Sequence, residues 1–389
     1  MIWCAPMSSS RLRVQTLCSI YGKLHGIPNC CIHLVENLDR RTIDASVMMP
    51  GAAPEHRAQS RALRLAVPPL AFRVLRRTVT GRHIHAILEW RYLRSLQPGS
   101  TTWLWPGASI RTMREAKRRG HQVVLERVNS PVASAARILT AAAERLDLPR
   151  SDGIDAEAIE REAAEIELAD YLFAPSPFVL KGFVDQGVPS NRLLPCSYGW
   201  DPERFPIEPR REYETSEPVF LFVGDGILRK GLPDLLEHWA AAKVPGKLRI
   251  VGPLDASIRE RYQKILSQPN VETLGFQKDL VSVYRQAHVF VLPSLEEGSP
   301  LVTYLALAAG IPSLVSLAGG GGVVTNDREG LIREPDDVDG FREALARLAT
   351  NADLRQQLGT AARDAAQRYT WKGAAEVRGE ALLQAKLRG

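Results

Sequence analysis

The stretch VFVLPSLEEGSPLVTYLALAAGIP, residues 289–312, combines three features in immediate succession. Its first residues, 289–294, form an apolar run that is typical of a buried strand. Glu297 and Gly298 follow, and the small apolar residues after Pro300 indicate a helix. A helix N-terminus offers unpaired N–H groups and partial positive charge, which suit a phosphate or sugar hydroxyls. The stretch predicts either a sugar-nucleotide site or an ordinary strand-to-helix turn of a doubly wound domain.

Alternating strand and helix patterns extend from this stretch in both directions. Strands are expected at residues 12–18, 45–49, 101–105, 122–127, 171–174, 192–195, 219–223, 248–251, 271–274, 289–292 and 313–316. Helical patterns lie between most of them, so we expect an α/β fold with two doubly wound parallel-sheet, Rossmann-like domains that face a cleft.

Glycine and proline become frequent at residues 198–202 and 206–209, which indicates a connection between domains. We therefore expect an N-terminal acceptor-binding domain at residues 1–200 and a C-terminal donor-binding domain at 201–372. A last helix, residues 373–389, is expected to pack back toward the first domain.

Composition is typical of a soluble globular protein, with 45% apolar and 24% charged residues among 389. No run of eighteen uncharged apolar residues appears, so the sequence predicts no membrane-spanning helix. The five cysteines have neither zinc-ligand spacing nor the even count of a disulfide framework. A cytoplasmic location fits these features.

The positive charge is concentrated between residues 57 and 94. This segment contains a single acid, Glu89, and nine arginines. The arginines are Arg57, Arg61, Arg64, Arg73, Arg76, Arg77, Arg82, Arg91 and Arg94. Basic amphipathic helices bind anionic membrane surfaces, although a solvated arginine face over an ordinary core stripe is an equal alternative. Nucleic acid is not expected, because no nucleic-acid-binding motif accompanies the charge.

A second turn, FVGDGILRKGL at residues 222–232, carries two adjacent cations after a predicted strand. Arg229 and Lys230 beside a glycine turn can neutralise a diphosphate without a metal ion, or they form a solvent-exposed basic turn. Gly224 permits a tight backbone approach.

These two turns, together with the Tyr198-Gly199-Trp200-Asp201 and Asn326–Ile332 segments, resemble the retaining GT-B glycosyltransferases of family four (glycosyl transferases group 1). The resemblance covers the C-terminal half and is looser over about the first 120 residues. It implies a nucleotide-sugar donor on the second domain, a glycan or lipid-linked acceptor on the first, and no metal or cofactor. Cell-surface polysaccharide synthesis is the expected setting.

The resemblance also assigns residues to the donor. It implies that Glu297 contacts the donor sugar and that Arg229 and Lys230 contact the diphosphate. It also implies that a stretch of backbone lies near the sugar and the phosphates, formed by Gly298, Ser299, Pro300, Leu301 and Val302. Gly224, Asp225 and Leu305 complete the expected donor site.

In the first domain, residues 22–26 match the position of a glycine-rich loop that closes over the donor phosphates. Gly22, Lys23, His25 and Gly26 are therefore candidates for contact with a phosphate or an acceptor. Arg127, Asn129 and Ser130 follow another predicted strand and are candidate acceptor contacts. Trp103 and Trp105 form either a sugar-stacking platform or part of the core.

Two positions depart from the family pattern. Leu305 replaces a glutamate that binds the nucleotide ribose in relatives, and Asp225 replaces an arginine near the diphosphate. These departures leave open an impaired or partner-dependent enzyme, or a non-catalytic scaffold. A GT-B nucleotide-sugar epimerase or a phosphorylase is a separate alternative. A metal-binding reading of Asp337-Val338-Asp339 competes with a helix cap, which the predicted helix start favours.

Overall fold

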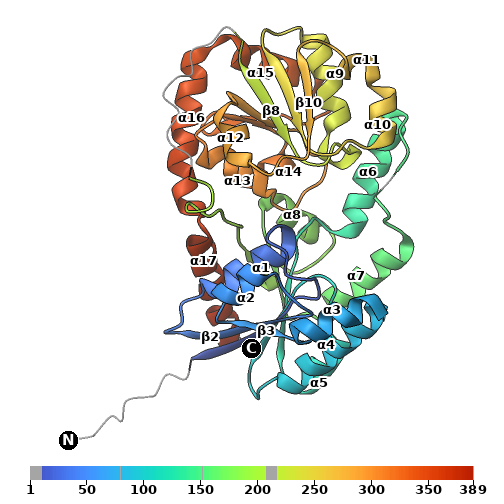
Figure 1. The fold of residues 1–389 in the computed structure, drawn as a ribbon, viewed down its shortest axis with the longest axis vertical. Coiled ribbons are helices and arrows are strands. Elements are labelled where there is room, and N and C mark those ends of the chain that lie inside the picture. The colour runs from blue at the N-terminus through green and yellow to red at the C-terminus, as the bar shows by residue number, and fades with distance from the viewer. Residues whose placement is uncertain (1–10, 79, 151, 207–216, 389) are drawn as a thin grey trace, which may run out of the picture. The chain divides into compact units, whose positions relative to one another are not determined.

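The computed structural model describes residues 11–78, 80–150, 152–206 and 217–388 (Figure 1). They form two compact units whose segments alternate along the chain. The first contains the described residues of Met1–Arg127, Ala163–Phe173 and Trp371–Gly389, and the second contains those of Val128–Glu162 and Ala174–Thr370. The chain passes between the units more than once, whereas the expected boundary near residue 200 is a single break. Residues 207–209 of the expected connection lie outside the described residues.

The first sheet has the strand order β3-β2-β1-β4-β5-β6-β7, with parallel pairings. Its strands are β1 (Leu12–Leu17), β2 (Ile43–Met49), β3 (Leu63–Leu65), β4 (Thr101–Leu104), β5 (Gln122–Glu126), β6 (Tyr171–Ala174) and β7 (Leu193–Pro195). β4 and β6 are buried along their whole length, as expected for strands of a parallel sheet.

The second sheet, in the second unit, has the order β10-β9-β8-β11-β12-β13, again with parallel pairings. Its strands are β8 (Val219–Val223), β9 (Lys247–Val251), β10 (Val271–Gly275), β11 (Val289–Leu292), β12 (Ser313–Val315) and β13 (Gly330–Ile332). The second sheet therefore follows the 3-2-1-4-5-6 order of Rossmann folds, and the first follows it with β7 added at the end.

Helices connect these strands in both units (Figure 1). Those of the first unit are α1 (Gly26–Glu36), α2 (Pro54–Gln59), α3 (Pro69–Thr78), α4 (Gly81–Ser95), α5 (Ile110–Arg118) and α17 (Trp371–Arg388). Those of the second unit are α6 (Val132–Leu146), α8 (Pro177–Asp185), α9 (Leu232–Ala242), α10 (Ala256–Arg261), α11 (Gln263–Leu266), α12 (Leu280–Arg285), α13 (Leu301–Ala308), α14 (Leu317–Gly320), α15 (Val338–Thr350) and α16 (Ala352–Ala366). α7 (Ala156–Leu168) contributes residues to both units, and the short 3-10 turns are η1 (Ser190–Arg192), η2 (Leu228–Lys230) and η3 (Gln367–Tyr369).

Every strand predicted from the sequence is confirmed, whereas β3, β13 and helix α8 were not predicted. α8 begins at Pro177 after the cap Ser176, whose side chain accepts a hydrogen bond from Val179 N. This serine–proline pair is a helix-start signal that the sequence contained. The Asp337 side chain likewise accepts a hydrogen bond from Gly340 N, which confirms its role as the cap of α15.

α17 is anchored in the first unit by a buried ion pair. Arg378 Nη2 lies 2.7 Å from Glu126 Oε1 at the end of β5, and both side chains are fully buried. Trp103 Nε1 donates to the other oxygen of Glu126 at 3.1 Å. Trp103 and Trp105 are both buried, so their core-packing interpretation is confirmed and the stacking-platform alternative is wrong.

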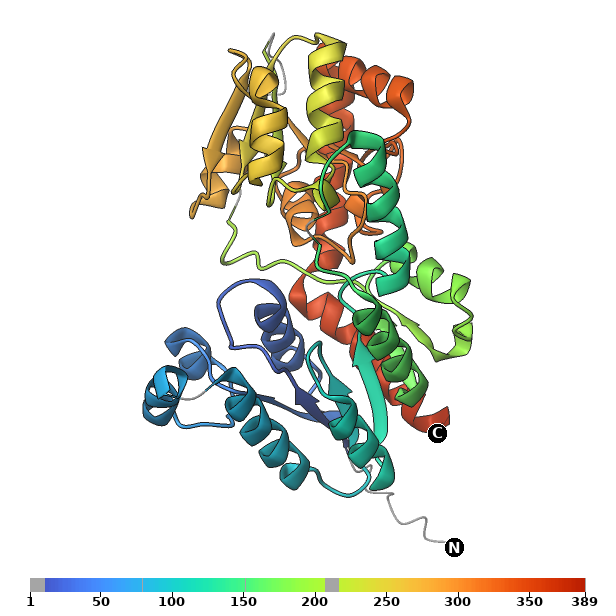
Figure 2. The same ribbon diagram turned by 90° about the vertical axis from the view of Figure 1, so that its right-hand side faces the viewer.

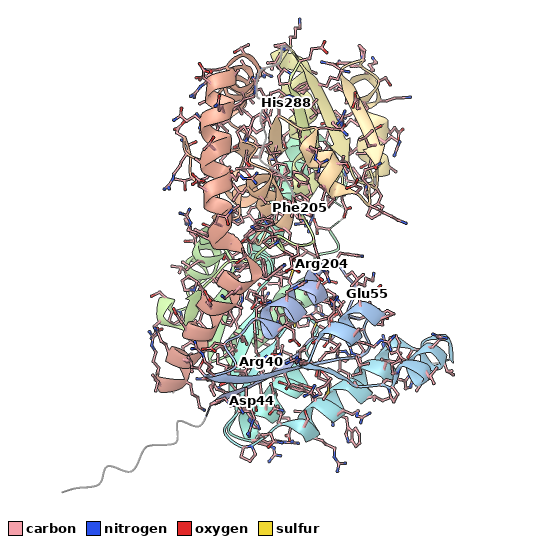
Figure 3. All side chains as sticks on the ribbon, turned by 60° about the vertical axis from the view of Figure 1, so that its left-hand side comes forward. Arg40, Asp44, Glu55, Arg204, Phe205 and His288 are labelled. Atoms are coloured by element: carbon pink, nitrogen blue, oxygen red, sulfur yellow. The ribbon has the colours of Figure 1, made fainter. Side chains whose placement is uncertain are left out.

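Two sets of contacts hold β8, β11 and α13 together in the second unit, and the first set lies at the amino ends of β8 and β11. His288 N donates to Val219 O at 2.8 Å, and Val219 N donates to His288 Nδ1 at 3.1 Å, which joins β8 to the start of β11. Phe205 packs edge-on against Tyr284, whose hydroxyl donates to Val302 O at 2.8 Å in the first turn of α13. Figure 3 labels His288 and Phe205 in this unit. These contacts fix β8, β11 and α13 next to one another.

Candidate functional site

The site lies where the strand order of the second sheet reverses, between β8 and β11. Ligands of open α/β sheets bind beyond the carboxyl ends of the strands at this reversal. The turn after β8 leads into η2 with Arg229 and Lys230, and the turn after β11 leads to Glu296 and Glu297. The topology therefore brings the two turns that were singled out in the sequence to one edge.

Gly231 allows the two turns to touch. It has φ +68°, a backbone conformation that favours glycine, and it ends η2. A Cβ atom at this position would lie only 1.9 Å from Pro293 O. The close approach lets Leu295 N donate to Arg229 O at 2.9 Å, which joins η2 to the loop after β11.

Four charged side chains meet at this junction. Arg229 Nη1 lies 3.0 Å from Glu297 Oε1 and 3.5 Å from Glu296 Oε2. Lys230 Nζ forms an ion pair with the same Glu297 oxygen. Both glutamates are buried, with 2% and 5% of their surface exposed, whereas the Arg229 side chain keeps 27%. The predicted residues Arg229, Lys230 and Glu297 thus lie together, and Arg229 is the most accessible of them.

Glu296 is a member of this cluster that sequence reasoning did not select. Its Oε1 accepts hydrogen bonds from Ser130 N at 2.9 Å and Ser130 Oγ at 2.8 Å. Burial and the adjacent Glu297 charge raise the pKa of Glu296, while Arg229 and Ser130 oppose that shift. The sequence signal was the doubled glutamate at 296–297, of which the family pattern singles out only the second.

The electrostatics of Arg229 reflect two opposing effects. Burial lowers the pKa of its guanidinium, but Glu297 and Glu296 outweigh burial, and the net pKa is raised. Two cations and two carboxylates give the cluster a formal charge near zero. Any anion that approaches the cluster must therefore compete with the glutamates for Arg229 and Lys230.

The backbone predicted to contact the donor is closely packed. A Cβ atom at Gly298 would lie 1.7 Å from Val128 O, so only glycine fits between the loops after β5 and β11. Ser299 Oγ lies 2.6 Å from the hydroxyl of Tyr304, which accepts a hydrogen bond from Tyr198 N at 2.9 Å. Pro300 is the N-cap residue of α13, and the first two residues of that helix, Leu301 and Val302, are half-buried. These contacts position the start of α13 beside Glu297.

The two departures from the family pattern take different positions. Leu305 is half-buried on α13, and Asp225 is exposed in the turn that begins at Gly224. The ion pairs described for Arg229 are made with Glu296 and Glu297 rather than with Asp225. Roles for Gly224, Asp225 and Leu305 in donor binding stay predictions.

The candidate residues of the N-terminal loop belong to the first unit. Gly22 packs against residues 49–52, since a Cβ atom there would lie 2.9 Å from Ala52 Cβ. Lys23, His25 and Gly26 are exposed, and His25 precedes the first turn of α1. Their contact with a phosphate or an acceptor stays a prediction.

The candidates after β5 separate into two environments. The Arg127 guanidinium lies 3.0 Å from Glu165 Oε2 in the first unit, and burial lowers its pKa. Asn129, in the second unit, lines a cavity together with Arg229 and Glu296. Within the second unit, the structure thus places Asn129 in the lining of the cavity beside the charged cluster, whereas the acceptor role of Arg127 stays a prediction. Within the part of the chain that the structure describes, no group of three or more His, Cys, Asp or Glu side chains is arranged to hold a metal ion.

Comparison with known proteins shows what the sequence and the fold of this chain are similar to. Residues 205–365 match the family model of glycosyl transferases group 1. The sulfoquinovosyl transferase SQD2 of Arabidopsis thaliana is 28% identical over 220 residues, which are 53% of this chain and 42% of that protein. The Escherichia coli UDP-Gal:alpha-D-GlcNAc-diphosphoundecaprenol alpha-1,3-galactosyltransferase is 34% identical over 105 residues, 26% of this chain and 27% of that protein. The chain thus matches less than half the length of either relative.

Solved structures agree at the level of the fold. Sucrose-phosphate synthase from Thermosynechococcus elongatus aligns with a TM-score of 0.69 at 19% identity, over 97% of this chain and 100% of that one. Anabaena HepE, in complex with UDP and glucose, aligns with a TM-score of 0.67 at 13% identity, over 96% and 100%. The chain therefore has the GT-B fold. Residues 205–365 carry the match to the glycosyl transferases group 1 family.

Proposed function

We propose that the chain is a retaining glycosyltransferase that moves a sugar from a nucleotide-sugar donor to a hydroxyl of a glycan or lipid-linked acceptor. The observation that carries this proposal is the convergence of Arg229, Lys230 and Glu297 at the strand-order reversal of the second sheet. A relative adds support, because the Escherichia coli protein is a UDP-Gal:alpha-D-GlcNAc-diphosphoundecaprenol alpha-1,3-galactosyltransferase. Synthesis of a cell-surface polysaccharide is the proposed setting.

In this proposal the two cations bind the diphosphate and stabilise the charge that develops on it. The bond between the sugar's anomeric carbon and the diphosphate oxygen breaks, and a bond from that carbon to the acceptor oxygen forms. The acceptor's proton passes to the departing diphosphate on the same face, which retains the configuration. Preorganised cations are effective because they need no reorganisation as charge develops. The cations of the chain supply this charge, and no metal ion is invoked.

Glu297 has two roles in the proposed reaction. Its Oε1 holds Arg229 and Lys230 in place before the donor arrives. When the diphosphate takes over the cations, the carboxylate accepts hydrogen bonds from the donor sugar's hydroxyls. Binding energy from these hydroxyls thus orients the anomeric carbon toward the acceptor.

A thermal-shift screen with UDP-, GDP-, ADP- and dTDP-sugars tests donor binding, because a bound ligand raises the melting temperature by mass action. One of the nucleotides is expected to produce a shift that Lys230→Ala weakens. The absence of a shift with all four favours the scaffold alternative. Turnover of the donor without any acceptor, to an epimer, favours the epimerase alternative.

We further propose that the enzyme is cytoplasmic and binds an anionic membrane surface through the basic segment at residues 57–94. Within that segment α3 exposes Leu70 and Val74, with 76% and 60% of their surface accessible, and α4 exposes Trp90 with 57%. Exposed apolar side chains among arginines suit the boundary between lipid headgroups and acyl chains. Across the described residues, none of the helices has the length and apolar character needed to span a membrane. The side chains of Arg76 and Arg77 lie outside the described residues.

A further inference from the structure

The second unit contains an open cavity of about 490 Å³ directly beside the charged cluster. This volume lies within the range of about 300–1,000 Å³ that is usual for small-molecule sites. Its polar end is formed by Asn129, Ser130, Arg229 and Glu296. Because Arg229 and Glu296 belong to the cluster, a molecule in the cavity adjoins the place where the proposed donor reacts.

One wall of the cavity is apolar. Val132, Ala135 and Leu139 come from successive turns of α6, and Ile227 and Leu228 come from the η2 turn. α6 is held there because Ala142, Ala143 and Leu146 pack with Leu228, and Arg145 lies 2.7 Å from Asp234 of α9. Figure 2 shows α6 beside the helices of the second unit. The wall suits an alkyl chain or the C–H face of a sugar ring.

The remaining polar groups of the lining are mainly acidic. Asp152 accepts hydrogen bonds from Arg150 and Ile154 N, and Asp255 accepts from Ser257 N and Oγ. These bonds fix the carboxylates and leave lone pairs for hydroxyl donors, since a carboxylate has about four acceptor sites. Together with Glu296 they place three acids in the lining beside Arg229, which the glutamates already hold.

We propose that this cavity binds the acceptor and that it selects an uncharged, hydroxyl-bearing group with an apolar face over a phosphorylated sugar. The inference rests on the proposed glycosyl transfer and assigns the acceptor class of that reaction. Hydroxyl groups of such a molecule donate to the fixed carboxylates, while its apolar part covers the α6 wall. A phosphate in the same position faces three carboxylates and one cation, Arg229, which Glu296 and Glu297 already hold, so the like charges disfavour its binding.

Ligand-observed NMR with saturation transfer tests the proposal without any turnover. The probes are octyl glucoside below its micelle-forming concentration and glucose 6-phosphate, each with and without UDP. Octyl glucoside is expected to receive saturation at both its ring and its alkyl protons, and at least tenfold more than glucose 6-phosphate. An equal or stronger signal from glucose 6-phosphate overturns the proposal.

Filling the cavity locates the binding. Val132→Phe introduces a larger side chain at a half-buried lining position of α6, and Ile154→Phe does the same from the segment that precedes α7. Either variant is expected to weaken octyl glucoside binding at least tenfold while UDP still raises the melting temperature. Val184→Phe, on the exposed side of α8 in the same unit, is the matched control and retains binding. Unchanged binding in both cavity variants overturns the assignment.

A charge variant tests the selectivity itself. Asp152→Asn removes one acid and frees Arg150, so the preference for octyl glucoside over glucose 6-phosphate is expected to fall severalfold. An unchanged preference contradicts the role given to the acids. UDP binding is a separate readout: if glycoside binding follows these expectations but no nucleotide binds, the proposed function fails while the cavity assignment stands.

Discussion

Replacement of Lys230 by alanine tests the proposed chemistry most directly. The Lys230 ammonium pairs with Glu297 Oε1 and keeps 13% of its side-chain surface exposed, so the pair is largely shielded from water. Removing one charge-assisted contact to a developing negative charge costs about 2–4 kcal/mol in the transition state. Lys230→Ala should therefore lower kcat/KM roughly 30- to 900-fold. Arg229 still faces the same Glu297 oxygen at 3.0 Å. The loss of folding stability should thus be smaller, about 1–3 kcal/mol.

The assay must separate a catalytic loss from a structural one. Initial rates with the donor identified by thermal shift give kcat/KM, and urea unfolding gives stability. The double variant Lys230→Ala/Glu297→Ala removes both charges, so it should regain most of the stability lost in the single variant. Its turnover should stay low, because neither the diphosphate contact nor the sugar contact remains. Lys264→Ala, at an exposed position of α11, is the control.

Two results would refute this reasoning. Wild-type-like turnover in both Lys230→Ala and Glu297→Gln, where at least a tenfold loss is expected for each, would remove these residues from the reaction. Recovery of turnover in the double variant would show that Lys230 only neutralises Glu297 in the folded protein.

Three further predictions concern the first unit. Arg378→Met leaves Glu126 buried without its cation and should destabilise the unit by about 3–5 kcal/mol, seen as a lower midpoint in urea unfolding; a midpoint like wild type contradicts the ion pair's role. The hydrogen bond to Glu89 raises the pKa of His85 in the folded protein. The pair therefore contributes its full stability below the unfolded-state pKa of about 6.5. That stability is lost as the pH rises through the raised pKa of the folded state. Melting curves from pH 5.5 to about 8.5 should show a smaller decline for His85→Gln than for wild type, and identical slopes would exclude the pair. Changing Arg73, Arg76 and Arg77 to Gln should weaken the salt-sensitive sedimentation of the protein with phosphatidylserine vesicles. The same change at the control positions Arg259, Arg285 and Arg328 should not weaken it. Equal sedimentation of the wild-type protein with neutral and with anionic vesicles would contradict the membrane proposal.

The sequence predicted the fold because each element carries its own local signal. Buried strands such as β8 and β11 appear as short apolar runs, and the turns after them contain the glycines that close contacts require. Arg229, Lys230 and Glu297 were identified for the same reason, since each follows a strand end that the pattern located. Boundaries between the compact units were not readable in this way, because they depend on which distant segments pack together.

The partners that complete the site could not be read from local patterns. Ser130 holds Glu296 from 166 positions away, and Arg378 reaches Glu126 across 252 positions. A single sequence does not indicate which distant residues will contact one another. In the sequence, two adjacent glutamates that become buried look the same as two glutamates of an ordinary acidic turn. The cavity beside α6 depends likewise on a helix of the first half packing on a turn of the second, η2.

In the proposed reaction, the doubled glutamate allows a phosphate site to be formed before the phosphate arrives. Two cations held close together without counter-charges repel each other, and burial of either would be costly. Glu296 and Glu297 remove that repulsion and fix the Arg229 guanidinium between them, with Ser130 holding Glu296 from the opposite side. In that proposed reaction the arrangement weakens donor binding, since the diphosphate must replace the glutamates. It also keeps the cations in position, so that less ordering remains to be done as the donor's bond breaks.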